Sequence, residues 1–129
     1  HTLKYSMKRP IYTIEEHDST FHLELYDQGV NLLLTSRSYS TFKECHAFLD
    51  TLRLHMHFQT NYVKTKNTTG QYGFEVRTCW DELIASSTWF ATIEDRADGL
   101  QAAFSCNTGA VFVHTNMYTE APRVLFQVA

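Results

Sequence analysis

The sequence predicts an α+β fold in which a tandem repeat of β(3)-α units forms one antiparallel sheet with two helices packed on one face. The main observation is internal: the stretches that start at Phe21 and Tyr72, 51 positions apart, run together without a gap for about 34 positions. An alternating strand, a turn and a helix start coincide in this register. Each copy alone, about 50 residues, would bury too little apolar surface to be safely stable. One core shared by both copies is therefore favoured over two independent domains.

Each copy begins with a strand whose apolar and polar side chains alternate. Residues 21–26 and 72–77 both have this period of two, which is typical of a half-buried strand. Short apolar strands are predicted to follow at 31–36 and 82–87. The connecting turn contains a glycine, Gly29, only in the first copy. Strands this close together in sequence indicate a meander and therefore antiparallel pairing.

A helix follows the strands in each copy. Thr41 and Thr92 are each followed three positions later by an acidic residue, which is the pattern of a capping box. Apolar residues then recur every three or four positions, so each helix should turn one stripe toward the sheet. The stripes are Phe42, Cys45, Leu49, Leu52 and Met56 in the first helix and Ile93, Ala97, Leu100 and Phe104 in the second. The helices are expected to end near His57 and near Ser105.

Further strands are expected outside the repeated core. Segments 12–14 and 62–64 predict a strand before each copy, and 111–113 predicts one after the second helix. The predicted organisation is a first repeat at 12–66, a second repeat at 61–115 that shares the linking strand, and an extra C-terminal strand within 116–129.

The motifs of the second copy are a turn with glycine, an aromatic alternating strand, a second strand that ends in serine, then an aromatic residue, a threonine and a helix. They lie at 69–77, 82–87, 89–92 and on to Ala103, with weaker counterparts at 21–25, 32–36 and 39–41. This pattern resembles the YegP-like domain of unknown function. The resemblance implies small bacterial proteins with tandem β(3)-α units in one sheet, or with one unit that dimerises, and a strand passed between halves. It implies no activity and no catalytic residue. The chain departs from the pattern in its long, histidine-bearing first helix, its Cys79-Trp80 turn and its extra C-terminal strand.

The composition narrows the class of function. Hydrophobic residues make up 43% and charged residues 19%, which indicates a globular chain. A net charge of −3 and a pI near 6.1 disfavour nucleic acid as a partner, and the absence of a long apolar run disfavours a membrane span. The three cysteines form no CxxC pair, so a reducing, cytoplasmic location is expected. No cofactor or metal is expected, because neither a glycine-rich phosphate loop nor zinc-ligand spacing occurs.

Four polar residues of the first helix, His46, Asp50, Arg53 and His57, fall on one face opposite the apolar stripe. They could form a metal or acid–base cluster, but a solvated helix face is the favoured interpretation.

Two repeated pairs invite a chemical interpretation. Ser36 and Ser87 occupy equivalent positions, and a turn or strand-end role is favoured over a nucleophile, which would need a neighbouring base. Glu24 and Glu75 could form a carboxylate pair if symmetry brought them together. Alternation places them on the face away from the helices, where a solvated role is favoured.

Aromatic residues at turns and off the apolar alternation are the candidate binding residues. Tyr26, Trp80 and Trp89 could form a surface patch, and Tyr39, Trp89 and Phe90 could line a pocket between the copies. The favoured function is a non-catalytic interaction or oligomerisation module whose partner is another protein or a second copy. A small-ligand binding domain is the alternative, and an enzyme that uses the histidine-bearing helix face ranks third. No catalytic residue is predicted.

Overall fold

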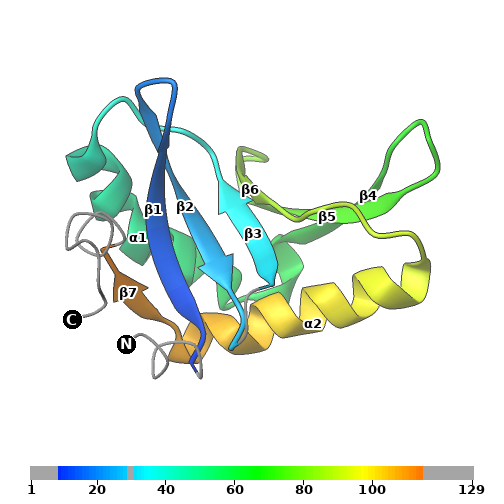
Figure 1. The fold of residues 1–129 in the computed structure, drawn as a ribbon. Coiled ribbons are helices and arrows are strands. Elements are labelled where there is room, and N and C mark those ends of the chain that lie inside the picture. The colour runs from blue at the N-terminus through cyan, green and yellow to red at the C-terminus, as the bar shows by residue number, and fades with distance from the viewer. Residues whose placement is uncertain (1–8, 29–30, 115–129) are drawn as a thin grey trace.

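Two helices and seven strands make up the described part of the chain, as the computed structural model shows for residues 9–28 and 31–114 (Figure 1). The strands are β1 (Ile11–His17), β2 (Thr20–Tyr26), β3 (Leu32–Ser36), β4 (Tyr62–Lys66), β5 (Tyr72–Arg77), β6 (Leu83–Ser86) and β7 (Val111–Val113). The helices are α1 (Phe42–Met56) and α2 (Ile93–Gly109), and a 3-10 turn at Gln59–Asn61 precedes β4. The α+β class is confirmed.

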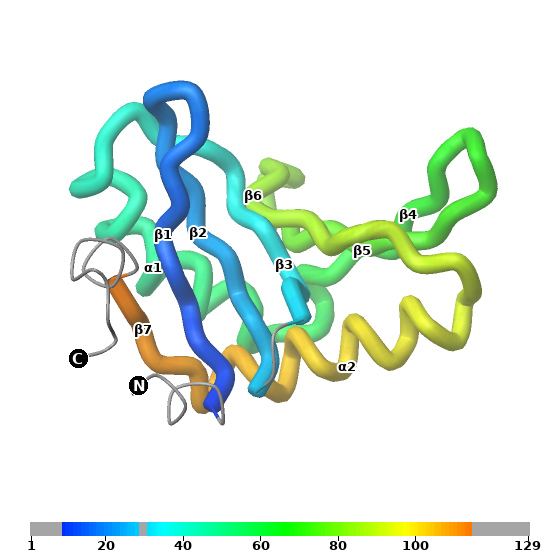
Figure 2. The backbone as a smooth tube through the Cα atoms, viewed as in Figure 1, coloured from blue at the N-terminus to red at the C-terminus, as the bar shows by residue number. Residues whose placement is uncertain are grey.

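All seven strands belong to one sheet, in the order β4-β5-β6-β3-β2-β1-β7. The two units meet where β3 pairs antiparallel with β6, with Thr35 opposite Ser86. The pairing is antiparallel elsewhere too, except that β7 lies parallel to β1. β4, which the sequence assigned to both units, pairs with β5, and β7 from the end of the second unit lies beside the first (Figure 2). The predicted single sheet with both helices on one face is confirmed.

Side chains that point into the core alternate along β2 and β5 with side chains that point away from it, as the sequences predict. Leu23 and Leu25 of β2 are fully buried, as are their counterparts Phe74 and Val76 of β5. The turn between β5 and β6 has no glycine and is made instead with Asp81 at a φ of 64°, which aspartate tolerates better than most residues. The predicted glycine turn at Gly29 lies outside the described residues.

Helix α1 matches its prediction. The Thr41 hydroxyl accepts a hydrogen bond from the Glu44 backbone N–H at 3.0 Å, so the helix begins with the predicted cap. The residues buried along the helix are Cys45, Leu49, Leu52 and Met56, while Phe42 is half-buried. The helix ends at Met56, one residue before the predicted position.

The predicted apolar stripe of α2 is wrong for its first two members, although Leu100 packs against the core and Phe104 is half-buried. Ile93 is 53% exposed and Ala97 is exposed as well. The buried residues of α2 are Gly99, Ala103 and Asn107. The helix approaches the sheet so closely that a Cβ atom on Gly99 would lie 2.4 Å from the ring of Phe90. Small side chains therefore face the core here, and hydrophobicity alone does not mark them.

The predicted end of α2 near Ser105 is also wrong, because the helix continues to Gly109. The added turn carries Asn107, whose amide accepts from the Tyr12 hydroxyl at 2.5 Å and donates to the Arg53 carbonyl at 3.1 Å. These tertiary hydrogen bonds join the end of α2 to β1 and α1, and they hold a turn that the local sequence does not favour.

The C-terminal strand predicted within 116–129 lies outside the described residues. In the described part of the chain, neither helix has the length and apolar character needed to cross a membrane.

Candidate functional site on the open face of the sheet

A row of side chains crosses the sheet on the face opposite the helices. Strand pairing brings six residues side by side in this row: Thr13, Glu24, Thr35, Ser86, Glu75 and Val63. Because Leu23 and Leu25 point into the core beneath the helices, Glu24 between them points the other way. We call this side of the sheet the open face, since both helices pack on the opposite side (Figure 1).

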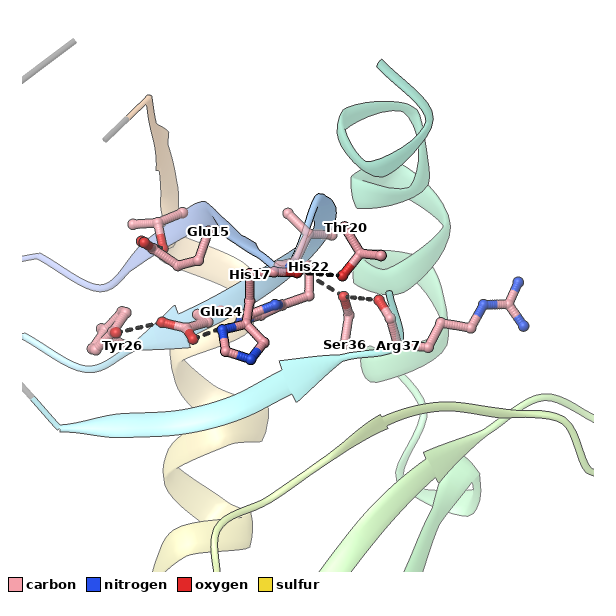
Figure 3. Close-up of polar contacts among 10 residues, drawn as sticks. Glu15, His17, Thr20, His22, Glu24, Tyr26, Ser36 and Arg37 are labelled. Carbon is pink, nitrogen blue, oxygen red and sulfur yellow. Dashed lines mark hydrogen bonds and ion pairs between the residues drawn. The ribbon is translucent and has the colours of Figure 1, made fainter. Parts of the chain in front are cut away.

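In the first unit, Glu24 is the centre of a polar cluster (Figure 3). Its Oε2 lies 2.8 Å from His22 Nε2, and its Oε1 accepts from the Tyr26 hydroxyl at 2.5 Å. The side chains of His22 and Glu24 are only 17% and 15% exposed. Burial first, and then the hydrogen bond to Glu24, raise the pKa of Tyr26 above its ordinary value, so the phenol remains a donor. Both carboxylate oxygens of Glu24 are thus engaged by neighbours on the same strand.

In the second unit, the equivalent carboxylate has a different setting. Glu75 accepts from Arg77 Nε at 2.9 Å through Oε1, and Arg77 also donates to the Asp81 carbonyl at 2.8 Å. Gly73 stands where the first unit has His22, so no side chain reaches Glu75 from that position. Trp89 lies directly on this glycine: a Cβ atom there would be 3.0 Å from the indole ring.

Beside Gly73 and the Trp89 ring that covers it, the open face has a hollow of about 140 Å³, which we call the Trp89 groove. It is lined by Thr65, Gly73, Phe74, Glu75, Leu83, Ser86, Ser87 and Trp89. Trp89 is 49% exposed and Leu83 is 40% exposed, and Val63, next to Glu75 in the row, is 41% exposed. The groove therefore combines an aromatic wall, apolar neighbours and one partly buried carboxylate.

A second hollow of about 370 Å³ lies at the end of β5. Its lining residues are Thr60, Asn61, Val63, Arg77, Thr78, Cys79 and Asp81. Apart from Thr60, its lining residues belong to the second repeat at 61–115, as do all those of the Trp89 groove. Arg77 connects residues of the two hollows. It donates one hydrogen bond to Glu75, which lines the Trp89 groove, and another to the carbonyl of Asp81, which lines the second hollow.

The two glutamates are neither a catalytic pair nor simply solvated. Three steps between neighbouring strands separate Glu24 from Glu75, about 14 Å at the usual strand spacing. Paired carboxylates of glycoside hydrolases lie within about 10 Å of each other. The expected solvated role is also wrong, since both side chains are partly buried and hydrogen-bonded.

The repeated serines have the predicted strand-end role. Ser36 Oγ accepts from the Leu23 backbone N–H at 2.8 Å, and Ser87 Oγ accepts from the Phe74 backbone N–H at 2.9 Å. Each hydroxyl then donates to the carbonyl of the residue that follows it. Both serines replace a missing ladder hydrogen bond.

The polar face of α1 does not gather into a reactive cluster. Arg53 turns toward α2, where it donates to the Asn107 and Ala110 carbonyls at 3.1 and 2.7 Å. His46 lies against aromatic rings instead, with its ring centroid 4.8 Å from that of Phe112. Asp50 and His57 are exposed. Among the residues that the structure describes, no group of three or more histidine, cysteine or acidic side chains is arranged to hold a metal ion.

The aromatic residues proposed as a patch are spread over the sheet. Tyr26 ends β2, while Trp80, which is 87% exposed, follows β5. Since β2 and β5 run in opposite directions, the two residues lie at opposite ends of the sheet. Trp89 lies at the same end as Tyr26, but over Gly73 on a strand three places away.

The other two residues proposed to line a pocket, Tyr39 and Phe90, pack against the helices. Tyr39 lies 5.1 Å from Phe48 of α1 between ring centroids, and its hydroxyl accepts from Arg37 Nε at 2.9 Å. Phe90 lies against Gly99 of α2. Of the five proposed residues, Trp89 is the one that lines a described hollow on the open face.

Two site residues were not singled out from the sequence: His22 and Gly73, which occupy the same position in the two copies. A signal was available, because a glycine inside an alternating strand often marks the close approach of another group. The glycine alone does not show that this group is Trp89. After β6 the chain runs beside the start of β5, where Phe90 and Tyr72 form an isolated β-bridge, and this pairing brings Trp89 to Gly73.

No protein-family model matches the sequence, and no curated protein matches it. Two solved structures are similar. The protein of unknown function yegP from E. coli has 19% sequence identity and a TM-score of 0.74, over 82% of this chain and 92% of that one. A UPF0339 protein from Shewanella oneidensis has 14% identity and a TM-score of 0.71, over 82% and 92%. The chain therefore has the YegP-like fold that the sequence resemblance implied. At these identities the likeness establishes the fold alone.

Proposed function

We propose that the protein is a non-catalytic interaction module that contacts a protein partner with the open face of its second unit. The supporting observation is Trp89, which is held on Gly73 with half of its surface exposed. Rigidly supported aromatic side chains are the usual anchors of protein interfaces. Val63 and Leu83 extend the apolar surface on either side of the groove.

The first unit offers no comparable surface at the equivalent place. His22, Glu24 and Tyr26 satisfy one another there, and their side chains close over the strand. Ser38 stands where the second unit has Trp89. The difference between two copies of one fold suggests that the second copy has a binding role, because the fold itself does not require an exposed tryptophan.

Photo-crosslinking in the cells that naturally make the protein tests this proposal. A benzophenone amino acid at position 83 should give discrete adducts, and the same probe at position 54 on α1 is the control, because Leu54 is also exposed (59%). Trp89→Ser, which installs the residue of the first unit, should abolish the adducts from position 83 while the circular dichroism spectrum stays native. Equal adducts from both positions, or adducts that survive Trp89→Ser, would reject the proposal.

A small-ligand binding domain is the second candidate. The hollow of about 370 Å³ beside Arg77 supports it, because ligand pockets commonly have volumes of about 300–1,000 Å³. Any ligand selective for the folded protein raises the melting temperature, so a thermal-shift screen of metabolites, nucleotides and metals tests this candidate. A shift that Arg77→Met removes would favour it, and a screen without any shift would count against it.

A further inference from the structure

The two equivalent glutamates differ in how many of their oxygens have a hydrogen-bond donor. In both units, one oxygen accepts from the residue two positions later, Tyr26 for Glu24 and Arg77 for Glu75. The other oxygen of Glu24 lies 2.8 Å from His22, two positions earlier. Within the described part of the chain, the other oxygen of Glu75 receives no hydrogen bond. The glutamate of the second unit thus keeps one acceptor for a group from outside.

The first unit shows what kind of group fits such a position. There, the imidazole of His22 lies beside the carboxylate and is largely buried (Figure 3). In the second unit, Gly73 has no side chain, Trp89 covers it, and the groove of about 140 Å³ lies beside Trp89 and Glu75. The groove is large enough for an imidazole ring, and both Trp89 and the Glu75 carboxylate line it.

We propose that the Trp89 groove is a binding site for a histidine side chain of the partner protein, whose ring N–H is donated to Glu75. This deepens the proposed function and rests on it. The incoming ring lies against Trp89 and completes, between two molecules, the pairing that His22 and Glu24 make within the first unit.

Local charge favours a neutral planar donor over a strongly charged ligand. Glu75 is already paired with Arg77, which weakens its attraction for an ammonium group, and its carboxylate disfavours an anion. The second carboxylate near Arg77, that of Asp81, is largely exposed to solvent, which screens its charge. Aromatic rings also gain from contact with an indole in a way that an aliphatic amine does not. The hydroxyl groups of Thr65 and Ser86, which line the groove, are available to the second ring nitrogen.

Two isomeric ligands test the proposal directly: 4-methylimidazole, which has a ring N–H, and 1-methylimidazole, which has none. The protein carries Trp80→Phe, so that Trp89 is its one tryptophan. At pH 9 both ligands are largely neutral. We expect saturable quenching of Trp89 fluorescence by 4-methylimidazole with a Kd of about 1–10 mM. The 1-methyl isomer should bind about tenfold more weakly, since the carboxylate hydrogen bond is lost.

Variants separate the groove from general effects. Glu75→Gln should weaken 4-methylimidazole binding about tenfold. Glu94→Gln on the exposed start of α2 should leave it unchanged, because Glu94 lies outside the groove. Equal binding of the two isomers, no saturation up to about 100 mM, or binding that Glu75→Gln does not weaken would overturn the proposal.

A converse variant tests the internal comparison. His22→Ala opens the equivalent space beside Glu24, so the number of 4-methylimidazole sites observed by NMR should rise from one to two. One site in a folded His22→Ala protein would contradict the equivalence of the two positions. If that variant does not fold, the isomer comparison decides.

Failure of this inference and failure of the proposed function have different signatures. Adducts from position 83 that depend on Trp89 but persist in Glu75→Gln would retain the interaction module and reject histidine recognition. Selective binding of 4-methylimidazole without any adduct from position 83 would support imidazole recognition by Glu75 in the Trp89 groove. It would reject the proposal that the protein is an interaction module.

Discussion

The buried hydrogen bond between Tyr12 and Asn107 offers a sharp test of whether the two units share one core. Tyr12 lies in β1 of the first unit and Asn107 in the last turn of α2, 95 positions later. Tyr12 is fully buried and Asn107 is 4% exposed. The Asn107 amide also donates to the Arg53 carbonyl, which lies in the last turn of α1. Substitutions here probe a contact made only when both units are packed together.

The expected energies follow from what each substitution leaves unpaired. Tyr12→Phe removes the donor and strands the buried Asn107 oxygen, which should cost about 1–2 kcal/mol. Asn107→Leu leaves the Tyr12 hydroxyl with only the Met56 sulfur, at 3.3 Å, and removes the donor to Arg53, so it should cost about 2–3 kcal/mol. The double variant lacks both the Tyr12 hydroxyl and the Asn107 amide, so neither of these two groups is left buried without its partner. Its cost should therefore be about 1–2 kcal/mol less than the sum of the single costs.

Urea unfolding of the four proteins, followed by circular dichroism at neutral pH, measures this coupling. We expect one transition in each protein, with similar m-values. Additive costs would show that the hydrogen bond does not link the units. Two separate transitions would refute the shared core outright.

Two further predictions concern packing and pH. Gly99→Ala should lower the melting temperature and cost about 1–3 kcal/mol, because the new Cβ would lie 2.4 Å from the Phe90 ring. Gly109→Ala, where a Cβ meets nothing within 4 Å, should be neutral or stabilise by up to about 1 kcal/mol, and the reverse order of melting temperatures would contradict this packing. Burial raises the pKa of the Cys45 thiol from 9.0 to about 11. Its contribution to stability is therefore fully present below pH 9 and is lost as the pH rises through 11, by about 2 kcal/mol. Urea unfolding at pH 8 and pH 11 measures this loss of stability. Between these pH values, the free energy of unfolding of Cys45→Ala should fall less than that of the parent protein.

The strands and the first helix could be predicted because their local patterns agree with their tertiary surroundings. The residues that alternate in β2 and β5 are the ones buried, and the Thr41 cap lies where its motif predicts. In α2 the agreement fails. Gly99 and Asn107 are buried by contacts with Phe90 and Tyr12, and neither glycine nor asparagine carries a hydrophobic signal.

The candidate site could be predicted only in part. The alternation placed Glu24 and Glu75 on the face away from the helices, and Trp89 was singled out as a candidate binding residue. The sequence did not show that Trp89 would lie on Gly73, because the two are 16 positions apart and meet only through strand pairing. Nor did it show that His22 would occupy the equivalent space, since that depends on comparing side-chain positions across the two units.

The pairing of β3 with β6 is the contact that makes two units one sheet, and NMR measures it most directly. Nuclear Overhauser effects should connect the backbone protons of Thr35 with those of Ser86, and those of Ser36 with those of Ala85. The amides that β3 and β6 direct at each other should also exchange slowly with solvent. Missing cross-peaks, together with rapid exchange of those amides as on a free sheet edge, would contradict the fold on which the open face and the Trp89 groove depend.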